Sequence, residues 1–257
     1  MNFNFKKKYG QNFLKHDNVS SRIVSLINTN KDTLVIEIGP GSGALTKHLS
    51  NLECNTICYE IDRELESPLN KYKSDKLDII YDDFMKRDIL SDISKYNYKK
   101  LVIIGNLPYY ITTPIILKII ETIIPDEMVF MVQKEVAERF SAKNKSKDYG
   151  SITVLINYYF DVSMEFIVKR DEFIPSPNVD SAVIKFKKKE LNDHVDMVKF
   201  NKILKDSFMF KRKNLRNNLK NYNKEEIEKV LAKYNFDLNN RAEDLPLEVF
   251  IELSKLI

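Results

Sequence analysis

The sequence predicts an α/β fold in which helices cover both faces of a parallel sheet, followed by a small all-helical domain. Short apolar runs alternate with helical segments over residues 33–189, which is typical of parallel strands joined by helical crossovers. From about residue 200 onward the pattern is helical only. The polar stretch 187–196 separates the two parts, so we expect a first domain at residues 1–190 and a helical domain at 191–257.

The individual elements follow from hydrophobic periodicity. We expect strands at 33–39, 55–62, 77–84, 100–107, 127–133 and 181–189, and helices at 17–29, 43–50, 63–73, 114–124, 134–141, 200–221, 224–234 and 246–256. The run 150–168 is expected to form a helix and then a strand. Asp17 is the expected cap of the first helix, and Pro114 is expected in the first turn of its helix.

The composition is typical of an ordinary globular protein. Apolar residues make up 43% of the chain, but no apolar run approaches the ~20 residues that a membrane span needs. The start of the chain lacks the apolar segment of a signal peptide. Cys54 and Cys58 are expected to be thiols of a strand rather than metal ligands or redox groups. We therefore expect a cytoplasmic protein without a metal site.

Positive charge is concentrated in one segment. The net charge of the chain is +4, but residues 185–220 contain twelve Lys or Arg and four Asp or Glu, a balance of +8, so the remainder sums to −4. A basic segment on a nearly neutral body is typical of proteins that bind nucleic acid. Solvated lysine-rich helices are also common, so charge alone leaves both interpretations open.

A glycine-rich turn follows the first expected strand in "VIEIGPGSGALT" (35–46). Its glycines let the backbone approach a ligand, and the start of the next helix offers free N–H groups. Glu60, twenty-one residues after Gly39, ends the second strand, where a carboxylate typically binds ribose hydroxyls. The same pattern satisfies the dinucleotide fingerprint, so a nicotinamide or flavin dinucleotide remains open.

Acids around this turn favour S-adenosyl-L-methionine as the ligand. Glu37 precedes the turn, and Asp82 and Asp83 end the third strand. The sulfonium of S-adenosylmethionine is cationic, so nearby carboxylates suit it better than they suit a pyrophosphate. A carboxylate at the end of the third strand could also accept a hydrogen bond from the amine of adenine. For Asp82, a plain surface position is an equally good interpretation.

The stretch "GNLPYYITTP" (105–114) places a carboxamide and aromatic rings at the end of a strand, where α/β folds bind ligands. An exocyclic aromatic amine is a poor nucleophile because its lone pair is delocalised into the ring. The side-chain oxygen of Asn106 and the carbonyl of Pro108 would each accept one N–H bond and so localise that lone pair. Tyr109 would stack on the extruded base. We expect the face of this ring to matter and its hydroxyl not to matter.

Six segments, in the same order along the chain, resemble the ribosomal RNA adenine N6-dimethyltransferase family. "NLPYYITTP" is similar to that family's motif N-[LI]-P-Y-x-I-[ST]-T-P. The others are "KYGQNFL" (8–14), "EIGPGSGALT" (37–46), "QKEVAERF" (133–140), "YGSITVL" (149–155) and "FIPSPNVDSAVIKF" (173–186). The resemblance implies a Rossmann-like class I methyltransferase sheet, S-adenosyl-L-methionine as methyl donor, and no metal.

The resemblance also assigns roles to residues. It implies donor contacts at Asn12, Leu14, Gly39, Gly41 and Asn106, a ribose contact at Glu60, and a contact with the donor's adenine at Asp83. Tyr109 would stack on the target adenine and Phe173 would close its other face, with a plain core position as the alternative for Phe173. Tyr110 departs from the family, which commonly has Asn there, and this alters the rim of the predicted target pocket.

The segment "FMFKRKNLRNNL" (208–219) resembles the signature F-x-x-R-R-K-x-[LI]-R-N-x-L of the small-subunit branch, with Lys211 in place of the first Arg. That branch dimethylates two adjacent adenosines in the 3′-terminal hairpin loop of 16S rRNA and takes part in small-subunit biogenesis. On a helix, Lys213, Arg216 and Lys220 would form a basic stripe facing phosphates. The expected RNA-binding residues are Lys211, Arg212, Lys213, Arg216 and Lys220.

Three other functions stay open at this level. A second branch of the family dimethylates a 23S rRNA adenine and confers macrolide resistance. A dinucleotide-dependent oxidoreductase would explain the glycine-rich turn but not N-L-P-Y, and a non-catalytic rRNA-binding assembly factor would keep the fold as a scaffold. We expect the small-subunit enzyme, a cytoplasmic monomer that acts on 16S rRNA in the small ribosomal subunit or its precursor, without membrane contact.

Overall fold

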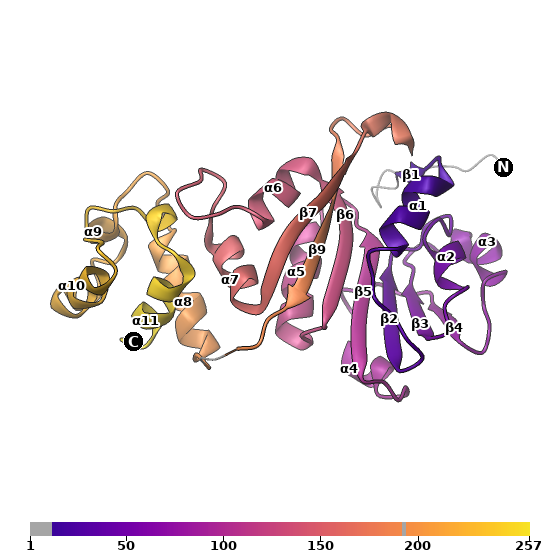
Figure 1. The fold of residues 1–257 in the computed structure, drawn as a ribbon, viewed down its shortest axis with the longest axis horizontal. Helices are drawn as coiled ribbons and strands as arrows, with labels where there is room; N and C mark the ends of the chain where they lie inside the picture. Colours follow the sequence, from indigo (N-terminus) through magenta and orange to yellow (C-terminus); the bar gives the residue numbers. More distant parts are fainter. Residues whose placement is uncertain (1–11, 192–193) are drawn as a thin grey trace. The chain divides into compact units, whose positions relative to one another are not determined.

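The computed structural model describes residues 12–191 and 194–257 (Figure 1). Part of the predicted block at 8–14, residues 8–11, therefore lies outside the described residues, as do positions 192 and 193 of the expected boundary stretch.

The chain divides into two compact units. The sheet unit comprises the chain up to Ala137 and Ser163–Lys188, and the helical unit comprises Glu138–Val162 and Lys189–Ile257. The chain passes from the sheet unit to the helical unit at Lys188–Lys189, close to the boundary expected at residue 190. The helical unit also includes Glu138–Val162, because α7 (Ser151–Tyr159) packs there against α8 (Met197–Ser207) and α11 (Leu247–Ser254).

Seven strands form one sheet in the order β4-β3-β2-β5-β6-β9-β7. They are β2 (Thr33–Ile38), β3 (Asn55–Tyr59), β4 (Leu77–Ile80), β5 (Lys100–Asn106), β6 (Glu127–Gln133), β7 (Phe160–Val168) and β9 (Ser181–Lys188). The strands from β4 to β6 pair in parallel, which confirms the predicted α/β sheet, whereas β9 pairs antiparallel with β6. The sheet is therefore mixed, because β9 runs antiparallel to the neighbouring strand β6.

Short helices connect the strands of the sheet unit. They are α1 (Asp17–Val24), α2 (Thr46–Leu49), α3 (Glu66–Asn70), α4 (Ile89–Ile93) and α5 (Thr112–Thr122), and α6 (Lys134–Phe140) follows β6. Helix α4 was not expected from the sequence. The predicted cap at Asp17 is wrong: His16 occupies the cap position, and the Asp17 carboxylate instead contacts Lys47 at 3.0 Å and His48 at 2.8 Å.

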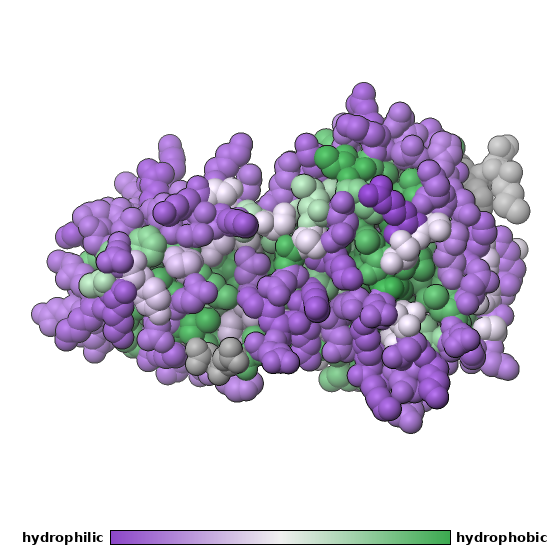
Figure 2. All heavy atoms as spheres, in the orientation of Figure 1, coloured by the Kyte–Doolittle hydropathy of each residue, from purple (hydrophilic) through white to green (hydrophobic). Residues whose placement is uncertain are grey.

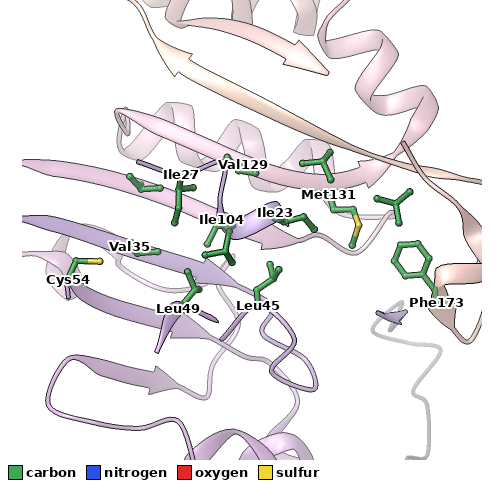
Figure 3. Close-up of a cluster of buried hydrophobic side chains, with 14 residues drawn as sticks. Ile23, Ile27, Val35, Leu45, Leu49, Cys54, Ile104, Val129, Met131 and Phe173 are labelled. Atoms are coloured by element: carbon green, nitrogen blue, oxygen red, sulfur yellow. The ribbon is translucent and has the colours of Figure 1, made fainter. Parts of the chain in front are cut away.

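A cluster of buried side chains lies between the sheet and helices α1 and α2 (Figure 3). Val35, Ile104 and Met131 come from neighbouring strands and share one face, because strand side chains alternate. Ile23 of α1 and Leu49 of α2 pack against them. The opposite face is covered as well, with α5 behind the strands in Figure 1. All residues of β2 are buried, as expected for a central strand between two helical layers.

Two strands of two residues each were not expected from the sequence. β1 (Phe13–Leu14) and β8 (Phe173–Ile174) pair antiparallel, with Leu14 opposite Phe173. The backbone N–H of Lys15 extends this ladder by donating to the carbonyl of Glu172 at 2.9 Å. The pair brings the beginning of the described chain to a segment that follows β7, and it has no signature in the sequence because each strand is too short for a periodic pattern.

The helical unit contains α7, α8, α9 (Leu215–Asn218), α10 (Lys224–Lys233) and α11. The single helix expected at 200–221 is wrong, because α8 ends at Ser207 and a loop precedes α9. The side chain of Asn214 caps α9, and the amide of Asn218 donates to the Ser207 carbonyl at 2.6 Å. Asn side chains compete in this way with the helical hydrogen bonds of the backbone. The basic residues of this segment therefore do not form one helical stripe.

The face shown in Figure 2 is mainly hydrophilic, and hydrophobic side chains are visible between the hydrophilic ones. Among the described residues, no helix combines the length and apolar character required to cross a bilayer. Cys54 and Cys58 are both free thiols in buried positions.

Candidate functional site

A pocket opens beyond the C-terminal ends of β2, β3, β4 and β5, where ligands of open α/β sheets bind. It encloses about 1030 Å³ of empty space, its open mouth included. The predicted residues that line it are Asn12, Leu14, Gly39, Gly41, Glu60, Asp83, Asn106, Pro108 and Tyr109. The fold thus gathers positions from five separate segments of the chain into one cavity.

The glycine-rich turn after β2 has a backbone conformation that other residues rarely adopt. Gly39 and Gly41 have φ values of +71° and +58°. A Cβ atom at Gly41 would lie 2.8 Å from the ring of Phe13, so this ring closes directly over the turn. Phe13 is a pocket residue that the sequence analysis missed, since nothing in its local pattern indicates a partner in the glycine-rich turn.

Glu60 stands directly after β3 in the pocket wall. One of its carboxylate oxygens accepts a hydrogen bond from the backbone N–H of Gly41 at 2.9 Å, and the other accepts one from Asp62 at 2.8 Å. The side chain is buried, and burial raises the pKa of its carboxyl. Each oxygen has a second lone pair. Glu60 is therefore fixed in position and retains the capacity to accept hydrogen bonds from a ligand.

Glu37 is a buried acid with an unsatisfied oxygen in the same wall. Its Oε2 accepts hydrogen bonds from Thr46 at 2.8 Å and from the thiol of Cys58 at 3.3 Å. Its Oε1 is buried and has no hydrogen-bond partner among the described residues. Burial raises the pKa of Glu37 to about 7. Because an unpaired buried acceptor is costly, this oxygen marks a place where a cationic or N–H-bearing ligand group would be stabilised.

The segment after β4 contributes Asp83 to the pocket. Its Oδ1 accepts a hydrogen bond from the backbone N–H of Met85 at 2.9 Å, and its Oδ2 lies 4.0 Å from Lys86. Lys118 of α5 donates to the carbonyls of Met85 and Arg87, both at 2.8 Å. This lysine, also missed by the sequence analysis, ties the segment after β4 to the helix that follows the Asn106–Tyr109 loop.

Asn106 ends β5 and contacts the beginning of the described chain. Its side-chain Nδ2 donates to the carbonyl of Asn12 at 3.0 Å, which leaves Oδ1 as an acceptor in the pocket wall. Gly105 allows this strand end to approach β2, because a Cβ atom there would lie 2.5 Å from the carbonyl oxygen of Ile38. The glycine-rich turn and the Asn106–Tyr109 loop therefore form adjacent walls of one pocket.

The carbonyl oxygen of Pro108 already accepts two hydrogen bonds. They come from the backbone N–H of Ile111 and the hydroxyl of Thr112, both at 3.1 Å. A carbonyl has two lone pairs, so the predicted bond from a target amine would require the Thr112 hydroxyl to turn away. The preceding residue, Leu107, also belongs to the pocket lining but is 1% exposed.

Tyr109 lies half-buried in the pocket wall. Its hydroxyl shares a hydrogen bond of 2.6 Å with the hydroxyl of Ser181, the first residue of β9. Burial raises the pKa of the Tyr109 phenol, so the group stays protonated at neutral pH. Tyr110 stands at the pocket rim with 62% of its surface exposed.

Phe173 does not line the pocket. Its ring is 1% exposed and belongs to the core cluster, together with Val168 and Val183 (Figure 3). The pairing of β8 with β1 accounts for this position, because it holds Phe173 opposite Leu14. In this arrangement the ring has no face open to a ligand. Phe173 thus occupies a core position, which was the alternative to stacking on the target adenine.

The predicted RNA-binding residues lie in the helical unit and are all exposed: Lys211, Arg212, Lys213, Arg216 and Lys220. Lys211 donates to the carbonyl of Lys147 at 2.8 Å. The other four make no ion pair with the described residues. They are distributed over the loop before α9, the helix itself and the residue after its C-cap.

The polar groups of the pocket fit a cationic nucleoside. Glu37 offers an unpartnered buried oxygen, and Glu60 offers further lone pairs. The turn at Gly39 leaves space for a ligand, because a Cβ atom there would meet only the Asn106 carbonyl, at 3.9 Å. No group of three or more His, Cys, Asp or Glu side chains in the described ranges is arranged to hold a metal ion.

Comparison with known proteins gives one consistent family. The family described as ribosomal RNA adenine dimethylase matches residues 2–257. A Lactococcus lactis protein named ribosomal RNA small subunit methyltransferase A is 43% identical over 98% of this chain and 90% of its own length. A Listeria innocua protein of the same name is 41% identical over 99% of this chain and 91% of its own length.

Solved structures of related fold agree with this result. A dimethyladenosine transferase from Plasmodium falciparum has a TM-score of 0.77 and 25% identity, covering 94% of this chain and 95% of its own. The 23S rRNA methyltransferase ErmE has a TM-score of 0.74 and 21% identity, covering 95% of this chain and 98% of its own, a likeness that concerns the fold alone. The predicted Rossmann-like methyltransferase fold is confirmed.

Proposed function

Because this chain belongs to the ribosomal RNA adenine dimethylase family, we propose that it transfers methyl groups from S-adenosyl-L-methionine to N6 of two adjacent adenosines in the 3′-terminal hairpin loop of 16S rRNA. The names of the relatives support the small subunit as substrate. The observation that carries the proposal is that buried acids and the loop from Asn106 to Tyr109 line the same pocket.

One side of the pocket holds the methyl donor, which supplies an electrophilic methyl group on a sulfonium. Glu60, fixed by the N–H groups of Gly41 and Asp62, accepts hydrogen bonds from the ribose hydroxyls. The unpartnered Oε1 of Glu37 stabilises positive charge at the methionine end. Asp83 accepts from the amine of the donor's adenine. Asn12, Leu14 and the glycine-rich turn complete this side of the pocket.

The other side of the pocket orients the target adenine. Oδ1 of Asn106 accepts one N–H bond from the exocyclic amine and thereby localises its lone pair. The carbonyl of Pro108 accepts the second, once the hydroxyl of Thr112 turns away from it. Tyr109 stacks on the base. No strong general base is needed, because the nitrogen becomes acidic after transfer and its proton leaves to water, so catalysis rests on orientation and electrostatics.

The helical unit binds the rRNA. Its exposed cations at Lys211, Arg212, Lys213, Arg216 and Lys220 neutralise phosphates, which makes binding dependent on salt. The sheet unit, which makes up most of the domain expected at 1–190, is then the catalytic part, and the segment 191–257 supplies the RNA-binding residues. We place the protein in the cytoplasm as a monomer acting on the small ribosomal subunit or its precursor, with a role in subunit biogenesis.

The test is a methylation assay on ribosomal subunits. Under-methylated small subunits are incubated with the protein and labelled S-adenosylmethionine, and the 16S rRNA is analysed for N6-dimethyladenosine. We expect two adjacent dimethylated adenosines in the 3′-terminal hairpin. Label in 23S rRNA instead would assign the chain to the large-subunit branch. Binding to the subunit without any methyl transfer would leave only an assembly role.

A further inference from the structure

The hydrogen bond between Tyr109 and Ser181 links the base-binding loop to a strand that contributes nothing else to the pocket. Tyr109 lies three residues after the end of β5, and Ser181 begins β9, 72 positions later in the chain. Their hydroxyl oxygens are 2.6 Å apart. Ser181 itself is fully buried and does not line the pocket, so a ligand in the pocket would touch the tyrosine and not the serine.

The position of Ser181 is fixed by the sheet. It stands opposite Gln133 in the antiparallel pair of β6 and β9, and the backbone N–H of Lys134 donates to the carbonyl of Asp180 at 3.0 Å. The carboxylate of Asp180 is itself engaged by the side chain of Lys169 at 2.9 Å and the N–H of Arg170 at 3.0 Å. The hydrogen bonds of the β6–β9 pair and of Asp180 thus fix the backbone from which the Ser181 side chain extends.

A tyrosine ring held only by its Cα atom can rotate about two side-chain torsions. In this structure the ring is held at both ends, by the loop at one end and by Ser181 at the other. A stacking surface that is already oriented before the base arrives avoids the ordering cost of binding. This differs from the expectation from sequence that only the face of Tyr109 matters, because the hydroxyl sets where the face lies.

We propose that Ser181 is a positioning residue of the methyl-transfer site, which orients the ring of Tyr109 for stacking on the extruded adenine. This inference rests on the proposed function, since it concerns how the target base is held. It assigns a role to a buried hydroxyl that touches neither donor nor base. It also predicts that the hydroxyls of Tyr109 and Ser181 act as one unit.

The test compares Ser181→Ala, Tyr109→Phe and the double variant in single-turnover methylation with saturating small subunits and donor. Each single variant should slow the methylation step about five- to tenfold, the effect expected for loss of one hydrogen bond. The double variant should be no slower than the slower single one, because both changes remove the same bond. Ser181→Thr keeps a hydroxyl and should recover most of the rate. Donor affinity, measured by calorimetry, should be unchanged throughout.

A matched control separates positioning from packing. Ser20→Ala removes a buried serine hydroxyl from α1, away from the pocket, and should leave the rate at the wild-type level. Thermal unfolding shows whether each variant is folded, and Tyr109→Phe provides the measurement if Ser181→Ala does not fold. A wild-type rate in both single variants, multiplied effects in the double variant, or Ser181→Thr as slow as Ser181→Ala would each overturn the proposal. A wild-type protein that transfers no methyl group would instead refute the proposed function itself.

Discussion

The pocket of the sheet unit and the basic segment 208–220 of the helical unit use polar residues in opposite ways. In the pocket, Glu60 and Asn106 are each held by hydrogen bonds to backbone atoms of other segments. In the basic segment, residues such as Arg212 and Lys213 are exposed and make no ion pair with the described residues. Preorganised groups act individually, whereas exposed cations act through the sum of their charges.

This difference predicts how each region responds to mutation. A single change in the pocket should have a large effect on one measurable step, because each side chain has a fixed role. A single change in the basic segment should have a small effect that depends on salt.

Asn106→Ala should cause the largest loss. It removes the side-chain acceptor aimed at the target amine, and one preorganised contact of this kind is worth about 3 kcal/mol, or roughly a hundredfold in rate. Single-turnover methylation with saturating subunits measures the methylation step directly. The control Asn51→Ala changes an exposed Asn outside the pocket and should have the wild-type rate. A rate for Asn106→Ala within a few-fold of wild type would refute the orienting role.

Glu60→Ala should mainly weaken donor binding. Charge-assisted hydrogen bonds to the two ribose hydroxyls contribute on the order of 1.5–3 kcal/mol, which is tenfold or more in affinity. Calorimetric titration with S-adenosylmethionine measures this loss, while subunit binding should remain unchanged. Glu53→Ala, an exposed acid of similar size, serves as the control. Equal donor affinity in the two variants would show that Glu60 is only a structural partner of Gly41 and Asp62.

Glu37 should make the stability of the ligand-free protein depend on pH. Its pKa is about 7 in the folded protein, because of burial, and close to 4.5 when exposed. The folded state therefore binds more protons than the unfolded state between these values, and the free energy of unfolding should fall as pH rises from about 4.5 to about 7. Each unit of pKa difference corresponds to about 1.4 kcal/mol.

Denaturant unfolding at pH 5, 6 and 7 checks this effect against Glu37→Gln, which carries no titratable proton. The stability of the wild type relative to the variant should decrease over this range. Parallel pH profiles for the two proteins would show that the Glu37 carboxyl titrates normally and that its unpartnered oxygen is hydrated.

Single substitutions in the basic segment should have the smallest effects. Replacing Lys213, Arg216 or Lys220 alone by Ala should weaken subunit binding slightly and reduce its salt dependence by roughly 0.7–0.9 slope units per lost phosphate contact. The triple variant should show the sum of the three effects, with unchanged donor affinity. A triple change of the exposed Lys31, Lys71 and Lys76 in the sheet unit removes the same charge as a control. Equal salt slopes for the two triple variants would make the segment an ordinary charged surface.

The parts of the site that lie within one strand–turn segment were predictable from the sequence. The turn at Gly39–Gly41, the carboxylate of Glu60 after β3 and the loop from Asn106 after β5 lie at the pocket as predicted. The alternation of strands and helices predicts parallel strands, and ligands bind beyond the carboxyl ends of such strands. Apolar runs and glycine positions are local patterns, so they can be recognised in a single sequence.

The structure differs from the expectations where distant segments make contact and where side chains compete for local hydrogen bonds. Phe173 was expected at the target base, but the pairing of β1 with β8 holds it in the core. The helix expected at 200–221 is interrupted because Asn214 and Asn218 bond to the backbone around the break. Hydrophobic periodicity continues across that break and therefore gave no warning of it.

The sequence by itself determined the α/β class, the family and most of the residues that line the pocket, because these depend on residue type and on spacing along one segment. Only the tertiary structure decided that Phe13 covers Gly41, that Asn12 orients the amide of Asn106, and that Ser181 holds Tyr109. Each of these contacts joins residues far apart in the chain. Their energy depends on distance and burial in the folded state, and no local pattern of residues encodes either quantity.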